Sequence, residues 1–194
     1  MLFRSGLVFH PKSPRFVVLG QARLLAERMR GRLKSVALIT DMDDAAIAEL
    51  VKTVAPEFLQ LHGSESVQRT AEIRARFGLP VIKALPVAEA SDLAAASDYE
   101  KVADMLMFDA KPPKGAMRPG GHGAAFDWRM LKDQIVRRPW FLAGGLNPEN
   151  VARAIDVSGA ERVDVSSGVE SAPGVKSDAR IAEFVAAAKQ KVRA

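Results

Sequence analysis

One complete structural unit can be read in Trp140-Phe141-Leu142-Ala143-Gly144-Gly145-Leu146-Asn147-Pro148-Glu149. The four apolar residues at its start predict a buried strand, and the paired glycines after them predict a tight turn. Asn147, Pro148 and Glu149 then mark the start of a helix: a cap residue, a proline at the first helical position and an acid in the first turn. The stretch therefore predicts a strand, a glycine turn and a helix in succession.

The same order recurs along the chain. Short apolar runs with little polar alternation are separated by longer amphipathic stretches, as expected for parallel strands covered on both faces. In the last stretch, Ile181, Phe184, Val185 and Ala188 fall on one face of a helix. The seven predicted strands cover residues 6–9, 35–39, 58–61, 81–85, 103–108, 140–143 and 162–165.

Two architectures fit such a series, an open doubly wound sheet and a (β/α)₈ barrel. The glycine-rich phosphate turn of a doubly wound dinucleotide domain follows the first strand, whereas this strand leads into His10-Pro11-Lys12-Ser13-Pro14-Arg15. The glycines instead follow the last two strands, as Gly144-Gly145 and Ser166-Ser167-Gly168, where barrel enzymes commonly hold a phosphate. We therefore predict an α/β (β/α)₈ TIM barrel with seven βα units present and the first unit missing, in a single domain over residues 1–194.

Composition and charge exclude several classes of protein. The chain has 194 residues, 48% of them hydrophobic, a formal net charge of +5 and no cysteine. It therefore has no disulfide framework, thiolate metal site or cysteine nucleophile. No apolar run approaches the ~20 residues of a membrane helix, and the start does not have the pattern of a secretory signal. We expect a cytoplasmic protein without membrane contact.

The basic run Arg28, Arg30, Arg32 and Lys34 favours a solvated helix end over a nucleic-acid surface. With one Tyr and two Trp, the chain offers few rings for stacking on bases. We expect no nucleic-acid partner, and a mildly positive surface suits a small anionic substrate.

Asp109 is a candidate general acid, because it ends an apolar run at the C-terminal end of a predicted strand, among the loops that carry chemistry in barrels. The alternative is a structural cap of the following loop. That loop, residues 110–125, is the longest irregular segment, and it predicts a lid, a binding loop or disorder.

Small residues at two adjacent strand ends predict an anion-binding cradle. Backbone N–H groups and hydroxyls serve as its donors, and they belong to Gly144, Gly145, Ser166, Ser167 and Gly168. The alternative is two ordinary turns. Arg15, in a proline-rich loop, has a guanidinium suited to a carboxylate or phosphate, although without further context a surface arginine is the better interpretation.

Two histidines and two aspartates end even-numbered strands of the barrel: His10, His62, Asp109 and Asp164. Such a set could bind a divalent metal, as in pentose-phosphate epimerases. No short ligand spacing supports it, and we predict no metal and no organic cofactor.

Several blocks, in order along the chain, resemble the phosphoribosylanthranilate isomerase family. They are Gly6 to Arg15, Leu59-Gln60-Leu61-His62-Gly63, Phe108-Asp109-Ala110-Lys111, Gly120-Gly121-His122-Gly123 with Phe126-Asp127-Trp128, Ala143 to Val151, and Val163 to Glu170. The resemblance implies a tryptophan-pathway enzyme that performs an Amadori rearrangement. N-(5-phosphoribosyl)anthranilate becomes 1-(2-carboxyphenylamino)-1-deoxyribulose 5-phosphate, without metal or organic cofactor.

The resemblance also implies roles for single residues. Asp109 matches the family's general acid, which protonates the furanose ring oxygen, and Arg15 matches its anthranilate-binding arginine. The two glycine-containing loops match its phosphate site. Asp164 matches a polar residue near the substrate, and we expect His62 to bind substrate as well.

The general base of the family is a cysteine on a first strand, and this sequence contains no cysteine. We therefore expect the first strand–helix unit to be absent, activity to be doubtful and the open barrel edges to allow self-association. Two alternatives stay open: another phosphosugar barrel enzyme, such as a metal-dependent pentose-phosphate epimerase, and a phosphate-binding remnant without catalysis.

Overall fold

The computed structural model describes residues 3–111, 126–132 and 134–191. The chain divides into two compact units, of which unit 1 comprises residues 1–84 and 98–105 and unit 2 comprises residues 85–97 and 106–194. Most of the predicted lid loop, with His122 and the glycine motif at 120–123, lies outside the described residues. The single domain over residues 1–194 stays a prediction.

Unit 1 is built on parallel strands that pair in chain order. Their bounds are β1 Arg4–Val8, β2 Lys34–Ile39, β3 Phe58–Leu61 and β4 Val81–Val87, the last of which continues into unit 2. β1 pairs with β2, β2 with β3, and β3 with β4, with Leu61 opposite Lys83. Leu59, Gln60 and Leu61 are all buried, so β3 is covered on both faces as predicted, whereas Gly6 in β1 is exposed.

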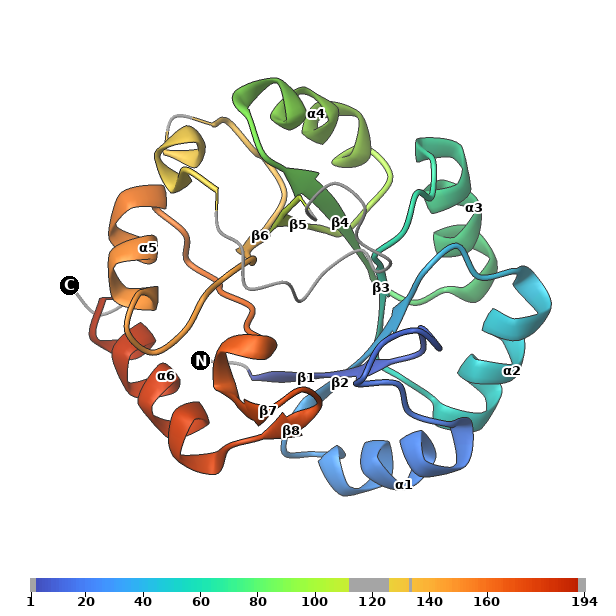
Figure 1. Cartoon of the computed structure of the whole chain (residues 1–194). Coiled ribbons are helices and arrows are strands. Elements are labelled where there is room, and N and C mark those ends of the chain that lie inside the picture. The colour runs from blue at the N-terminus through green and yellow to red at the C-terminus, as the bar shows by residue number, and fades with distance from the viewer. Residues whose placement is uncertain (1–2, 112–125, 133, 192–194) are drawn as a thin grey trace. The chain divides into compact units, whose positions relative to one another are not determined.

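Three helices follow the strands of unit 1 and lie along one face of its sheet (Figure 1). They are α1 Leu19–Met29, α2 Asp44–Val54 and α3 Val67–Phe77. Side chains cap α2 and α3, because Asp43 accepts a hydrogen bond from Ala46 N and Ser66 accepts one from Arg69 N. Gly78 ends α3 at φ +64°, a left-handed conformation that favours glycine. The short helix α4 Ala96–Tyr99 crosses the boundary between the units.

Unit 2 carries the later elements of the chain. They are η1 Ala90–Ala95, β5 Met105–Ala110, η2 Trp128–Leu131, β6 Trp140–Leu142, α5 Val151–Ser158, η3 Ser167–Val169, β7 Glu170–Ala172, β8 Val175–Lys176 and α6 Asp178–Lys191. β5 and β6 pair in parallel, and the rings of Phe108 and Trp140 meet edge to face with their centroids 5.5 Å apart. α5 and α6 pack side by side (Figure 1). Of the four residues predicted on the apolar face of α6, Phe184 and Ala188 are buried, Val185 is half-buried and Ile181 is exposed.

The seventh predicted strand, residues 162–165, is reduced to one parallel bridge between Leu142 and Val163. Leu142 N donates to Arg162 O at 2.9 Å, and Asp164 N donates to Leu142 O at 2.8 Å. The seven predicted units are therefore not confirmed: the described residues hold six strands in the βα series and this bridge. Polar residues at 161, 162 and 164 leave little apolar side chain to bury here. The antiparallel hairpin of β7 and β8 was not predicted from the sequence.

The longest helix in the described part of the chain, α6, has 14 residues. Among the described residues, no helix combines the length and the apolar character needed to cross a membrane.

The core of unit 1 can be tested on two helix residues of equal size. Ile47 on α2 is fully buried, whereas Leu24 on α1 is 55% exposed. We expect Ile47→Ala to lower the free energy of unfolding by about 2–5 kcal/mol, because it removes apolar burial and leaves a cavity. Leu24→Ala should change it by about 0.5 kcal/mol or less. Urea denaturation measures both, and equal losses would contradict the assignment of α2 to the core.

Candidate functional site

Asp109 lies near the C-terminal end of β5, with only 9% of its surface exposed. The next strand ends beside it, because Ala143 N donates a hydrogen bond to Phe108 O at 2.8 Å. The glycine turn that follows β6 therefore begins next to the residues around Asp109. Within unit 2, the predicted acid and the first predicted phosphate loop adjoin.

Gly144 lies against Ala110, the residue after Asp109, through its backbone alone. It has φ +85°, and a Cβ added to it would lie 2.4 Å from Ala110 N. Gly145 follows at φ +66°. Both conformations are in the left-handed region, where a side chain is strained, and at Gly144 no space for one exists. The turn can lie against the residue after Asp109 only because Gly144 has no side chain.

Gly168 makes a second contact of the same kind. A Cβ added to it would lie 1.9 Å from the carbonyl oxygen of Leu146. Gly168 belongs to the short helix η3, for which Ser166 is the N-cap residue. The two loops predicted to form one anion cradle are therefore in direct backbone contact.

Side chains of unit 2 hold the carbonyl groups of these loops. Asn150 Nδ2 donates to Gly145 O at 2.9 Å, Lys176 Nζ to Ser166 O at 2.7 Å, and Arg180 Nε to Gly168 O at 3.1 Å. Lys176 and Arg180 also bring positive charge, although carboxylates pair with both. Sequence reasoning did not assign these roles. Asn150 stands in one of the quoted family blocks, but no local pattern marks Lys176 or Arg180.

Asp164 lies at the end of the bridge that extends β6, two residues before Ser166, and its side chain is exposed. It thus lies just before the second loop, at the C-terminal end of a strand-like segment, and its place near a substrate stays a prediction.

Arg15 and His62 belong to unit 1. Arg15 sits in a turn tied to the end of β1, where Ser13 N donates to His10 O at 2.9 Å and Val17 N donates to Val8 O at 3.0 Å. His62 directly follows β3. Because β1 and β3 both pair in parallel with β2, the two residues lie at the C-terminal ends of the two strands that flank β2 in one sheet.

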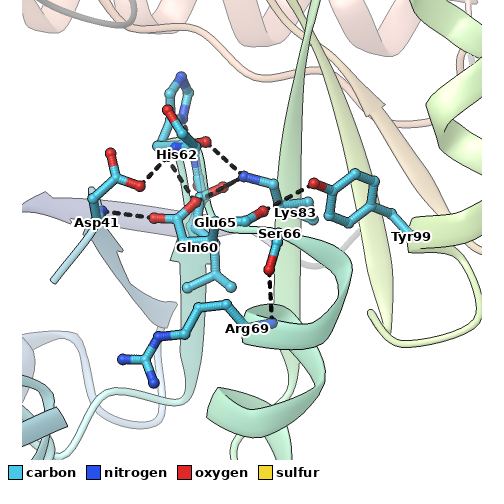
Figure 2. Close-up of polar contacts among 11 residues, drawn as sticks. Asp41, Gln60, His62, Glu65, Ser66, Arg69, Lys83 and Tyr99 are labelled. Atoms are coloured by element: carbon cyan, nitrogen blue, oxygen red, sulfur yellow. Dashed lines mark hydrogen bonds and ion pairs between the residues drawn. The ribbon is translucent and has the colours of Figure 1, made fainter. Parts of the chain in front are cut away.

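A buried polar cluster underlies His62 (Figure 2). Lys83 Nζ and Glu65 Oε2 are 2.7 Å apart, with 3% and 2% of their side chains exposed. Lys83 Nζ also donates to Gly63 O at 2.7 Å, and Glu65 accepts hydrogen bonds from Asp41 N at 2.8 Å and Gly63 N at 3.0 Å. Sequence reasoning missed this cluster. Lys83 is the one charged residue in the predicted strand 81–85, and that interruption is a signal that could have identified it.

Tyr99 covers the cluster. Its hydroxyl donates to the carbonyl oxygen of Glu65 at 2.9 Å, and the ammonium of Lys83 lies 5.7 Å from the centre of its ring. Burial raises the pKa of the Tyr99 phenol above its usual value, and the negative charge of Glu65 raises it further.

Within the ranges that the structure describes, no group of three or more His, Cys, Asp or Glu side chains has the arrangement of a metal site. The described side chains of His10, His62, Asp109 and Asp164 form no such group.

Comparisons with known proteins point to one family. Its model, described as N-(5'phosphoribosyl)anthranilate (PRA) isomerase, matches residues 3–187. A relative named N-(5'-phosphoribosyl)anthranilate isomerase from Cereibacter sphaeroides (strain ATCC 17023) is 53% identical over 184 residues, 95% of this chain and 87% of that protein. A protein of the same name from Rhodopseudomonas palustris (strain BisA53) is 54% identical over 188 residues, 97% of this chain and 86% of its own.

Solved structures agree with these relatives. A crystal structure of phosphoribosyl anthranilate isomerase from Thermotoga maritima has a TM-score of 0.84 and 35% identity, covering 96% of this chain and 88% of its own. A crystal structure of phosphoribosyl anthranilate isomerase in complex with reduced 1-(o-carboxyphenylamino)-1-deoxyribulose 5-phosphate has a TM-score of 0.81 and 32% identity. It covers 96% of this chain and 87% of that chain.

The contact at Gly168 gives a test of the anion cradle. We expect Gly168→Ala to weaken the binding of inorganic phosphate by tenfold or more, because its Cβ would force the two loops apart. Gly20→Ala is the control, since a Cβ there meets nothing within 4 Å and lies in α1. Isothermal titration calorimetry measures both affinities. Equal phosphate binding by the two variants would place the anion elsewhere.

Tyr99 is the sole tyrosine of the chain, so the ultraviolet absorbance of tyrosinate reports it alone. We expect its pKa to lie above the usual value of about 10. Because the folded state holds the phenolic proton more tightly than the unfolded chain does, this contribution to stability is complete below about pH 10 and is lost as the pH rises through the folded pKa. The stability of Tyr99→Phe should lack that component. A phenol that titrates at or below its usual pKa would contradict the burial of Tyr99 against Glu65.

Proposed function

Since this chain belongs to the N-(5'-phosphoribosyl)anthranilate isomerase family, we propose that it catalyses the Amadori rearrangement of N-(5-phosphoribosyl)anthranilate in tryptophan biosynthesis. The product is 1-(2-carboxyphenylamino)-1-deoxyribulose 5-phosphate, and the enzyme class is intramolecular isomerase. The observation that carries the proposal is identity above 50% to relatives of this name over 95% or more of the chain.

The phosphate of the substrate binds to the loops at Gly144-Gly145 and Ser166-Ser167-Gly168. The carbonyl groups of Gly145, Ser166 and Gly168 accept hydrogen bonds from side chains of unit 2, so they are held by the protein itself. The N–H groups of the same loops and the two serine hydroxyls supply the donors for the anion. Lys176 and Arg180 hold these loops, and Glu170 and Glu149 partly offset the positive charge that the two side chains bring.

Asp109 acts as the general acid. Its carboxyl protonates the furanose ring oxygen, the ring opens to a Schiff base, and loss of the C2′ proton then yields the product. The contact between Gly144 and Ala110 supports this assignment, because it ties the strand that carries the acid to the loop that holds the phosphate. Arg15 binds the anthranilate carboxylate, and His62 and Asp164 contact the substrate; these roles rest on the family resemblance.

The base that takes the C2′ proton is a cysteine in the family pattern, and these 194 residues contain none. Because no thiolate is available to take the C2′ proton, we propose that these 194 residues alone show no measurable isomerase activity. Joining a strand–helix unit of the family type, with its cysteine, to the chain should supply the base and restore turnover. Self-association and a cytoplasmic location stay predictions. Neither alternative, a metal-dependent pentose-phosphate epimerase or a phosphate-binding remnant, is supported by the names of the relatives.

Replacing Asp109 tests the acid in the chain extended by that unit. Asp109→Asn keeps the shape of the side chain and removes the proton donor, so turnover should fall about 10²-fold or more. The matched control is Asp127→Asn, whose carboxylate is exposed and bound to Arg129. Product formation is measured at saturating substrate. Near-normal turnover in Asp109→Asn would make Asp109 a structural residue, and no acceleration on extension would reject the cysteine as the base.

A further inference from the structure

We propose that Glu65 and Lys83 are positioning residues for His62, and that the Glu65 cluster (Asp41, Gly63, Glu65 and Lys83) fixes this histidine for binding the substrate. The role of His62 toward the substrate rests on the proposed function. The fixing of its conformation rests on the contacts of unit 1 alone (Figure 2).

The first support is the cost of the buried pair. Transfer of two charges from water into the protein is unfavourable, and an apolar pair of similar volume would often stabilise a fold as well or better. Glu65 and Lys83 are nonetheless 4% and 2% exposed as whole residues. Their polar atoms are met by one another and by main-chain groups, which is the arrangement in which a buried network rigidifies its surroundings. Conformational specificity explains this pair better than stability does.

The second support is that the hydrogen bonds of Glu65 and Lys83 go to main-chain groups on both sides of His62. Lys83 Nζ donates to the carbonyl oxygens of Leu61 and Gly63, at 3.4 and 2.7 Å, and Glu65 accepts from Gly63 N. Leu61 and Gly63 are the residues immediately before and after His62. The backbone of His62 itself donates to Ile39 O at 2.9 Å. The pair therefore holds the main chain on both sides of the histidine.

The third support is the fit between the loops after β2 and β3. The Asp41 carboxylate accepts a hydrogen bond from Ser64 N at 2.7 Å and occupies the space of a Gly63 side chain, since a Cβ there would lie 2.6 Å from it. Asp41 has φ +47°, a left-handed conformation that is uncommon for a residue with a side chain. The hydrogen bond from Asp41 N to Glu65 helps to hold that conformation. Glu65 thus joins both loops.

The fourth support is the histidine ring. Gln60 Nε2 and His62 Nδ1 are 2.9 Å apart. With the amide nitrogen donating, Nδ1 accepts and the ring proton resides on Nε2. This contact requires the main chain between residues 60 and 62 to keep its conformation, which is the segment that Lys83 holds at Leu61 O. The Glu65 cluster therefore holds the segment that places His62, and Gln60 sets which ring nitrogen can donate to a ligand.

The test compares Glu65→Gln with Asp104→Asn. Asp104 forms an ion pair with Arg74 and accepts from Val81 N at 2.9 Å, so it binds the opposite, N-terminal end of β4. Both variants should be less stable than the parent chain. Only Glu65→Gln should move the ¹⁵N signals of the His62 ring away from the pattern of a proton on Nε2. It should also weaken binding of the reduced product analogue by about tenfold, the worth of one positioned hydrogen bond.

Gly63→Ala is a second variant that removes no charge and serves if Glu65→Gln does not fold. Its Cβ displaces the Asp41 carboxylate from Ser64 N, and we expect the same change in the His62 ring signals. The proposal is overturned if folded Glu65→Gln and Gly63→Ala show the same His62 ring signals and the same affinity for the analogue as Asp104→Asn. If the parent chain does not bind the analogue, the proposed function fails, but the ring signals still decide whether Glu65 positions His62.

Discussion

Contact between backbones at Gly144 and Gly168 is the constraint on which the candidate site of unit 2 depends. Each glycine lies where a single added carbon would overlap another strand end or loop. This closeness brings the end of β5 against the turn after β6, and the segment after that turn against the helix η3. Hydrogen bonds from Asn150, Lys176 and Arg180 then fix the loops in place. A side chain at either glycine would force these backbone segments apart.

Much of the fold could be predicted because it depends on local pattern. The apolar run at residues 58–61 matches β3 at both ends, and the family predicted from the quoted blocks was confirmed. The segment 162–165 failed as a strand because its polar residues give a sheet little to bury. The hairpin of β7 and β8 was missed because its stability comes from contacts within the loop, such as the hydrogen bonds of Glu170 with Lys176 and Gly174, rather than from periodicity.

The candidate site likewise contains residues that could be predicted from the sequence and residues that could not. Glycines, serines and a carboxylate at strand ends are recognisable in a sequence because their chemistry is tied to their position along the chain. Glu65 and Lys83 are 18 residues apart, and their pairing arises only when β3 and β4 align. Lys176 and Arg180 likewise could not be predicted, because the carbonyl groups of Ser166 and Gly168 that they bind come near them only in the folded chain. The roles of Asp109, Arg15, His62 and Asp164 in catalysis stay predictions.

The single bridge at Leu142 and Val163 has a consequence for how unit 2 unfolds locally. β6 has three residues, and the segment after it joins the ladder at one position, so few strand hydrogen bonds must break for the loops to open. Segments with so little ladder are the first to open in native-state fluctuations. A bound anion that bridges both loops would suppress those openings and protect their amides from exchange. With such an anion bound, the two loops would open only together with the rest of unit 2.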